Sequence, residues 1–329
     1  MALTSGQRGK VFERFILEVL KSCGFTNVVP DDQIIYEVSG NIMLHGLAQP
    51  HNTDVLVDPP FQIPFFFPSR LIVECKCLKE QVGLPVIRNA LGLRTDVNGF
   101  DIVTEAILNK RRNYRRAGLA VFKRDRCFYQ VAVASFSGFS KPAEEFALVH
   151  GIQLINIERM PFSNVLRSFL LPDNLNGEQL EDGAEGRDPD VAELWQDLRA
   201  RIGDTLKNFY IAVLSSGDLL FLYTDQGGKW LLEDEDVELH WAESLKLWQI
   251  KPYGGNQDQQ AWFELPDRLF EQWAQMSFSR DEAISLKEKE FQRVYVMGQD
   301  ANGVLRLNVL RISSSFIKEA RERLKIMGD

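Results

Sequence analysis

Three charged side chains lie within two segments that are otherwise apolar. Residues 71–77, LIVECKC, contain Glu74 and Lys76, and residues 53–58, TDVLVD, contain Asp54. Both segments have the composition of buried strands. Two carboxylates on adjacent strands can hold a hard divalent cation, because such cations prefer oxygen ligands. A lysine beside them can stabilise charge on an attacked phosphate or help to position a water molecule.

The alternation of side chains along a strand places Glu74 and Lys76 on one face, together with Ile72. The alternative is a solvated strand face with a cross-strand ion pair. Glu13, at the edge of the apolar face of an N-terminal helix, is a candidate third carboxylate, although a charged residue in that place is ordinary. The ordered series of helix Glu, strand Asp and strand Glu-x-Lys favours a site over the ion pair alone.

The hydrophobic pattern predicts the elements that would position these residues. Helical spacing indicates helices at 5–21, 82–93, 102–117 and 141–151. Strands are predicted at 34–38, 42–47, 53–58, 70–77, 126–136 and 152–157. Strands that alternate with helices indicate an α/β fold with a mixed central sheet flanked by helices.

A second domain is predicted after an acidic linker. Residues 171–190 contain seven acidic residues and one arginine, and residues 191–329 show an amphipathic helix, several strands with turns, and a closing helix. Residues 1–170 hold 20 Lys and Arg against 16 Asp and Glu, whereas residues 171–329 hold 18 against 30. We therefore expect an N-terminal domain at 1–170, a linker at 171–190 and an acidic α+β domain at 191–329 with a different partner.

The N-terminal half resembles the restriction-endonuclease-like superfamily with a PD-(D/E)xK site, and within it the Mrr-like nucleases. The matching stretches are GKVFERFILEVLKSCGF, NTDVLV, LIVECKCLKEQVGLPVIRNALG and VASFSGFSKPAEEFALVHGIQLINIE. The resemblance implies metal-dependent hydrolysis of DNA, with Asp54 and Glu74 as ligands of Mg²⁺ or Mn²⁺, Lys76 as a catalytic residue and Glu13 as an auxiliary acid. It also implies a role in restriction or defence against foreign DNA.

The sequence departs from that family in three places. The acidic strand lacks the usual Pro-Asp dipeptide, a long Phe/Pro-rich loop separates Asp54 from Glu74, and residues 94–127 are longer than the usual connection. The two longer segments put the substrate geometry in doubt rather than the catalysis.

A cluster of basic residues follows in the same half. Residues 109–118, NKRRNYRRAG, contain Lys110, Arg111, Arg112, Arg115 and Arg116. Contact with the phosphate backbone of DNA is one reading of this helix, and a solvated surface is the other.

These observations predict a metal-dependent endonuclease, a hydrolase that acts on DNA. The alternatives are a non-cleaving nucleic-acid-binding or sensor protein on the same fold, and a protein-interaction module. A homodimer is compatible with the activity, because cutting both strands usually needs two sites, and residues 191–329 could dock a protein partner or self-associate. No apolar run is long enough for a membrane helix, and the four cysteines have no zinc spacing, so we expect a cytoplasmic protein without membrane contact.

Overall fold

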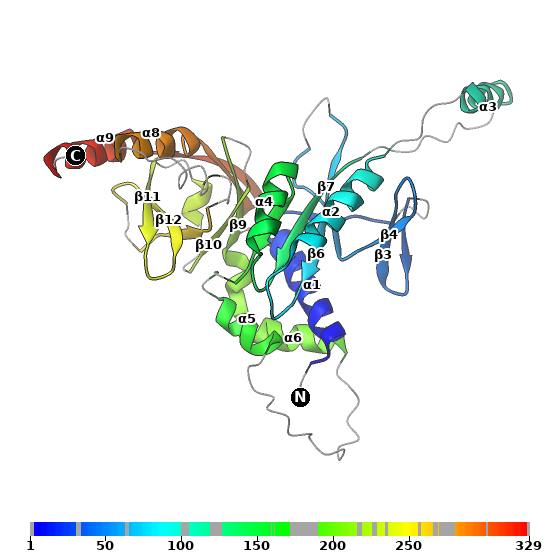
Figure 1. Ribbon diagram of the computed structural model, residues 1–329, viewed down its shortest axis with the longest axis horizontal. Coiled ribbons are helices and arrows are strands. Elements are labelled where there is room, and N and C mark those ends of the chain that lie inside the picture. The colour runs from blue at the N-terminus through cyan, green and yellow to red at the C-terminus, as the bar shows by residue number, and fades with distance from the viewer. Residues whose placement is uncertain are drawn as a thin grey trace, which may run out of the picture.

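A computed structural model describes most of the 329 residues. The described residues are 3–30, 34–62, 66–99, 105–118, 127–158, 160, 162–171, 190–215, 219–225, 229–233, 236–255, 258–265, 269, 280–300 and 302–327. They form several sheets flanked by helices, in a mixed α/β arrangement (Figure 1).

A five-stranded mixed sheet forms the centre of the N-terminal part. Its strands are β1 (Thr26–Asn27), β5 (Val55–Asp58), β6 (Ser69–Lys76), β7 (Phe128–Ser135) and β8 (Gln153–Asn156), in the order β1-β5-β6-β7-β8. β5 pairs antiparallel with both β1 and β6, and β6, β7 and β8 are parallel. The mixed sheet predicted from the sequence is thus confirmed.

Helices cover both faces of this sheet. Helix α1 (Ser5–Ser22) buries its apolar stripe on one face, together with Val73 and Cys75 of β6. Helices α2 (Leu84–Val97) and α4 (Lys141–His150) pack on the other face with Ile72. This division confirms the alternation of side chains predicted for residues 71–77.

A smaller sheet leads directly into β5. Strands β2 (Ile35–Val38), β3 (Asn41–His45) and β4 (Pro50–Thr53) pair antiparallel in the order β2-β3-β4. Asp54 alone separates β4 from β5. The remaining helices of this part are α3 (Glu105–Arg116) and α5 (Ser163–Leu170).

The C-terminal part contains a closed seven-stranded barrel. Its strands are β9 (Phe209–Leu214), β10 (Leu219–Thr224), β11 (Asp236–Ala242), β12 (Leu247–Pro252), β13 (Ala261–Phe263), β14 (Val294–Gln299) and β15 (Leu305–Ile312), in the order β10-β13-β12-β11-β15-β14-β9. Helix α6 (Val191–Ile202), α8 (Arg280–Glu290), α9 (Ser314–Met327) and the short 3₁₀ helices η1 (Gly203–Asn208) and η2 (Lys229–Leu232) accompany it. The sequence predicts strands and helices here but not the closure into a barrel.

One hydrophobic core joins residues from both sides of the 171–190 segment. The ring centroid of Phe209, on β9, lies 6.5 Å from that of Phe15 on α1 and 5.1 Å from that of Phe162. The thiol of Cys23, just after α1, donates to the Phe209 carbonyl at 3.5 Å. Helix α1 also packs against α6. We name this group of buried residues the shared core, and the domain boundaries at 170 and 191 stay a prediction.

The tryptophans of the C-terminal part are mostly inside it. Trp195, Trp230 and Trp262 are buried, whereas Trp241 is 45% exposed. Trp273 lies outside the described residues. Within the part of the chain that the structure describes, no helix combines the length and the apolar character needed to cross a membrane.

Candidate functional site

The register of β5 on β6 brings the two strand carboxylates together. Val55 pairs with Val73 in the antiparallel ladder, so Asp54 stands opposite Glu74. One carboxylate oxygen of Asp54, Oδ2, accepts a hydrogen bond from the backbone N–H of Cys75 at 2.8 Å. The neighbouring strand itself therefore fixes the orientation of Asp54.

Lys76 joins this pair from the same face of β6 as Glu74. Its ammonium group donates a hydrogen bond to the Glu74 carboxylate. Both side chains are a little under one-third exposed, so the pair is partly shielded from water yet open to a ligand. The sequence left open a cross-strand ion pair as the alternative. In the structure Lys76 pairs with Glu74 of its own strand instead.

Glu13 and Lys10 approach the site from α1. The Lys10 Nζ donates to Glu13 Oε2 at 2.8 Å and to the side-chain oxygen of Asn41, on β3, at 3.0 Å. Glu13 is half-buried, and Lys10 ties it to the smaller sheet. Lys10 was not among the residues predicted from the sequence. The pattern that could have indicated Lys10 is its position three residues before Glu13, because this spacing places the two side chains next to each other on a helix.

The pKa shifts indicate that these charges act on one another. Burial raises the pKa of Asp54, and the negative charge of Glu74 raises it further, while the Cys75 N–H opposes the shift. Burial also raises the pKa of Glu13, against the Lys10 hydrogen bond and with support from the charges of Asp54 and Glu74. The three carboxylates therefore share one electrostatic environment.

The pKa of Lys76 is raised as well, but for a lysine this shift favours the charged form. Burial acts to lower its pKa, but the hydrogen bond and negative charge of Glu74 outweigh burial, and the net pKa is raised. Lys76 is thus held as a cation beside the two strand carboxylates.

Asp54 and Glu74 fit a divalent cation of the magnesium type. Each uses one carboxylate oxygen in the bonds described above and has a second oxygen. Mg²⁺ is usually bound by only one or two carboxylates, with substrate and water completing the octahedron. No set of three or more His, Cys, Asp or Glu side chains within the described residues could hold a metal ion. Burial and the charges of Asp54 and Glu74 raise the pKa of Glu13, so Glu13 belongs to the electrostatic surroundings of the pair.

The basic segment forms helix α3, apart from β6 in Figure 1. The side chains of Lys110, Arg112, Arg115 and Arg116 are exposed, and that of Arg111 lies outside what the structure describes. The Lys110 ammonium lies 5.7 Å from the ring centre of Tyr114. The structure thus presents cations to solvent on α3 but does not include them in the carboxylate cluster.

Comparisons with known proteins identify no family. No family model matches the sequence, and no curated protein matches it. Among solved structures, a protein described as being of unknown function, AF1548, is similar at 15% identity and a TM-score of 0.29. The match covers 46% of this chain and spans 60% of that protein's length.

Proposed function

We propose that the protein is a metal-dependent endonuclease that hydrolyses phosphodiester bonds of DNA, on a restriction-endonuclease-like fold of the Mrr type. The observation that carries the proposal is that Asp54, next to β5, stands opposite Glu74 of β6 and accepts a hydrogen bond from the Cys75 N–H, while the Lys76 ammonium is bonded to Glu74. Phosphodiester hydrolysis needs charge stabilisation around the phosphate more than covalent chemistry, and this set of charges supplies it.

Each side chain has a distinct role in the proposed reaction. Asp54 and Glu74 would hold the cation, which when bound stabilises negative charge and lowers the pKa of a bound water. The Cys75 N–H keeps the Asp54 carboxylate in place before substrate arrives. Lys76, held by Glu74, is positioned to stabilise the charge that develops on the phosphate oxygens.

Two further groups have auxiliary roles. Glu13 would tune the negative charge around the pair, and Lys10 holds Glu13 against Asn41. The exposed cations of α3 would contact the phosphate backbone without reading the base sequence. In biological terms the proposed role is restriction or defence against foreign DNA.

Nicking of a supercoiled plasmid by the purified full-length protein tests this proposal. We expect cleavage with Mg²⁺ or Mn²⁺ and none with a chelator. Asp54→Asn, Glu74→Gln and Lys76→Ala should each lower the rate by at least about a hundredfold, as is typical when a charge-stabilising group is removed. Glu13→Gln should cause a smaller loss because Glu13 lies outside the carboxylate pair.

The matched control is Glu80→Gln, which makes the same change at an exposed position shortly after β6. It should leave the rate unchanged. Wild-type cleavage by the Glu74→Gln protein would refute the assignment of the site. A wild-type protein that binds DNA but shows no metal-dependent cleavage would replace the endonuclease by a non-cleaving DNA-binding protein.

A further inference from the structure

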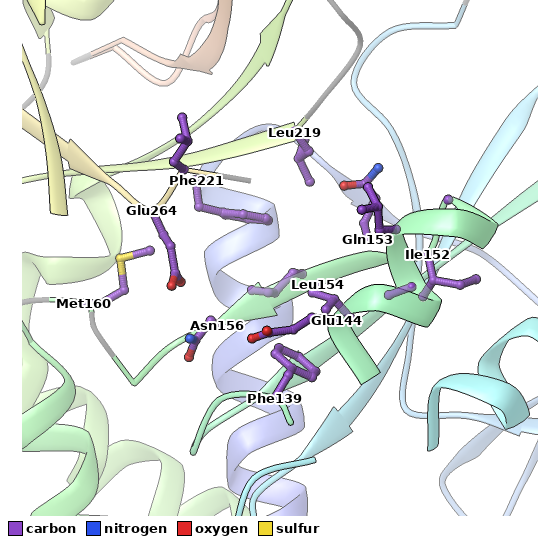
Figure 2. A pocket seen from close by; sticks show the side chains of 15 residues that line it. Phe139, Glu144, Ile152, Gln153, Leu154, Asn156, Met160, Leu219, Phe221 and Glu264 are labelled. Atoms are coloured by element: carbon purple, nitrogen blue, oxygen red, sulfur yellow. The ribbon is translucent and has the colours of Figure 1, made fainter. Parts of the chain in front are cut away.

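A cavity separate from the candidate site lies where the central sheet meets the barrel. Its volume is about 280 Å³, and its walls come from α4 and β8 on one side and from β10 and the residues after β13 on the other (Figure 2). Its lining, among the described residues, contains no lysine, arginine or histidine, and it shares no residue with the Asp54 and Glu74 pair. The surface around that pair, rather than this cavity, is therefore where the rest of a DNA strand would lie.

The smaller sheet is attached to the candidate site at two points. Asp54 directly follows β4, the last strand of that sheet. The side-chain oxygen of Asn41, the first residue of β3, accepts a hydrogen bond from the Lys10 Nζ at 3.0 Å. Both attachments lie at the same end of the sheet, because Ile42 of β3 pairs with Thr53 of β4. The start of β3 is thus held beside the carboxylates.

One face of the smaller sheet begins at this attachment. Side chains alternate along β3, so Asn41, Met43 and His45 share a face. The register of β2 on β3 adds Tyr36, opposite Met43, and Val38, opposite Asn41. We name these five residues the Tyr36 face. All five are half-buried or exposed, and none is part of a hydrophobic core in the described part of the chain. The opposite face of the sheet, in contrast, contributes to the core with α2 and α4.

The Tyr36 face carries a pair of rings at some distance from the carboxylates. The ring centroids of Tyr36 and His45 lie 5.0 Å apart, with an interplanar angle of 34°. Between Asn41 and His45 the strand advances about 13 Å, at about 3.3 Å per residue. Val38, beside Asn41, is 49% exposed. A half-exposed path about 13 Å long therefore leads from the Lys10 contact to the ring pair.

Rings next to a phosphodiester-hydrolysing site suit contact with bases. Every base has a face that stacks on a protein ring, whatever the sequence. In a duplex, however, both faces of a base are covered by its neighbours, so only a base that has left the stack can use such a surface. We propose that the Tyr36 face holds unpaired bases beside the scissile phosphate. The substrate would then be single-stranded DNA, or a duplex with an unpaired segment, and this inference rests on the endonuclease proposed above.

Lys10 supplies a cation along the same path. Its side chain is 45% exposed even though its ammonium bonds Glu13 and Asn41. These two bonds take two of the three donors of an ammonium group. The third would contact a backbone phosphate of the strand that runs from the carboxylates to the rings. Lys10 thereby gains a contact with substrate in addition to its hold on the smaller sheet.

Fluorescence anisotropy of labelled DNA tests base contact without cleavage, with a chelator present. The probes are a thymidine strand of about 12 nucleotides, within the usual site sizes for single-strand binding, and a duplex of the same length. The full-length wild type should bind the single strand more tightly than the duplex at equal ionic strength. Tyr36→Ala should weaken single-strand binding by at least about fivefold, as expected for one lost stacking contact, and duplex binding by less than about twofold.

Two further variants serve as controls. Tyr36→Phe keeps the ring and should bind the single strand within about twofold of the wild type. Tyr295→Ala makes the alanine change at a half-buried tyrosine on β14 of the barrel and should alter neither affinity by more than about twofold. Equal losses for the two probes in Tyr36→Ala would overturn the inference, because they would indicate damage to the fold. A wild type that prefers the duplex would overturn it too.

Cleavage separates this inference from the endonuclease assignment. With Mg²⁺, a duplex that contains a bubble of unpaired thymidines should be cut within the bubble, and Tyr36→Ala should lower that rate by at least about fivefold. A fully paired linear duplex that is cut as fast as the bubble would overturn the inference and leave the endonuclease standing. If neither DNA is cut but single-strand binding still depends on Tyr36, the endonuclease fails and the base-binding face stands.

Discussion

Replacement of Phe209 by alanine should destabilise both parts of the protein at once. Phe209 lies on β9 of the barrel, is 1% exposed, and packs in the shared core against Phe15 of α1 and Phe162. A cavity at this place removes packing from α1 as well as from the barrel. We therefore expect the loss to appear in both parts of the structure rather than in the barrel alone.

The size of the effect follows from burial and ring contacts. Large-to-small changes of a buried phenylalanine cost about 3–5 kcal/mol of the free energy of unfolding. Phe209 also has Tyr223 as a ring neighbour at 5.4 Å, and each aromatic pair adds about 0.5–1.5 kcal/mol beyond its buried area. The cost of about 3–5 kcal/mol includes these ring contacts, and with a urea dependence of about 3 kcal/mol/M it should lower the midpoint by about 1–1.7 M.

Tryptophan and cysteine residues allow the unfolding of the two parts to be followed separately. All six tryptophans follow residue 190 and all four cysteines precede residue 128. Tryptophan fluorescence therefore reports the C-terminal part. Alkylation of Cys75, measured by peptide mass spectrometry, reports the central sheet, because Cys75 is buried and its pKa is raised well above the usual range by burial. The two urea transitions should coincide in the wild type and shift together in Phe209→Ala.

The control is Phe66→Ala, the same change at a side chain that is 74% exposed. It should alter the free energy of unfolding by less than about 0.5 kcal/mol, as is usual for surface positions. A Phe209→Ala protein whose fluorescence midpoint falls while its Cys75 midpoint stays at the wild-type value would refute the coupling of the two parts through the shared core.

Two further predictions concern DNA contact and the space around two glycines. Changing both Arg115 and Arg116 to alanine should weaken DNA binding for all sequences, and it should reduce the slope of log affinity against log salt by up to about 0.9 per lost phosphate contact. The same double change at Arg199 and Arg201, in the last turn of α6, should leave both quantities unchanged. An unchanged slope in the α3 variant would make α3 a solvated surface. Gly298→Ala should cost about 1–3 kcal/mol in urea unfolding, because its methyl group would overlap the buried ring of Tyr210. Gly92→Ala, in α2 with open space around it, should instead stabilise by about 0.5–1 kcal/mol; equal effects at the two glycines would contradict this packing.

Elements with a strong local pattern could be predicted from the sequence. Helix α1 was expected at 5–21 and spans Ser5–Ser22, because its apolar residues repeat at helical spacing. Thr4 is the N-cap, and it forms a capping box with Gln7. A serine, threonine pair offers two capping hydroxyls, and the residue that caps is decided by where the first turn begins.

Features that depend on pairing between distant segments were not predictable in this way. Strand β4, with the sequence PHNT, has no apolar alternation and is a strand because β3 pairs with it. Closure of the barrel needs the parallel pairing of β11 with β15 and the pairing of β9 with β14, which no local pattern encodes.

Part of the candidate site could likewise be predicted from the sequence, and part could not. The placement of Glu74 and Lys76 on one strand face follows from alternation alone. The hydrogen bond from the Cys75 N–H to Asp54, and the bridge from Lys10 to Asn41, need the tertiary structure. That the cluster hydrolyses DNA stays a prediction until the cleavage assay is done.

The shared core has a consequence for the order of events during synthesis. Cys23, which follows α1, contacts the carbonyl of a residue 186 positions later in the chain. Translation proceeds at about 5–20 residues per second, so about 10–40 s pass between the synthesis of Cys23 and that of Phe209, the first barrel residue on that side of α1. Throughout that interval the apolar residues at the barrel-facing side of α1 are a surface on which a chaperone or another nascent chain can act.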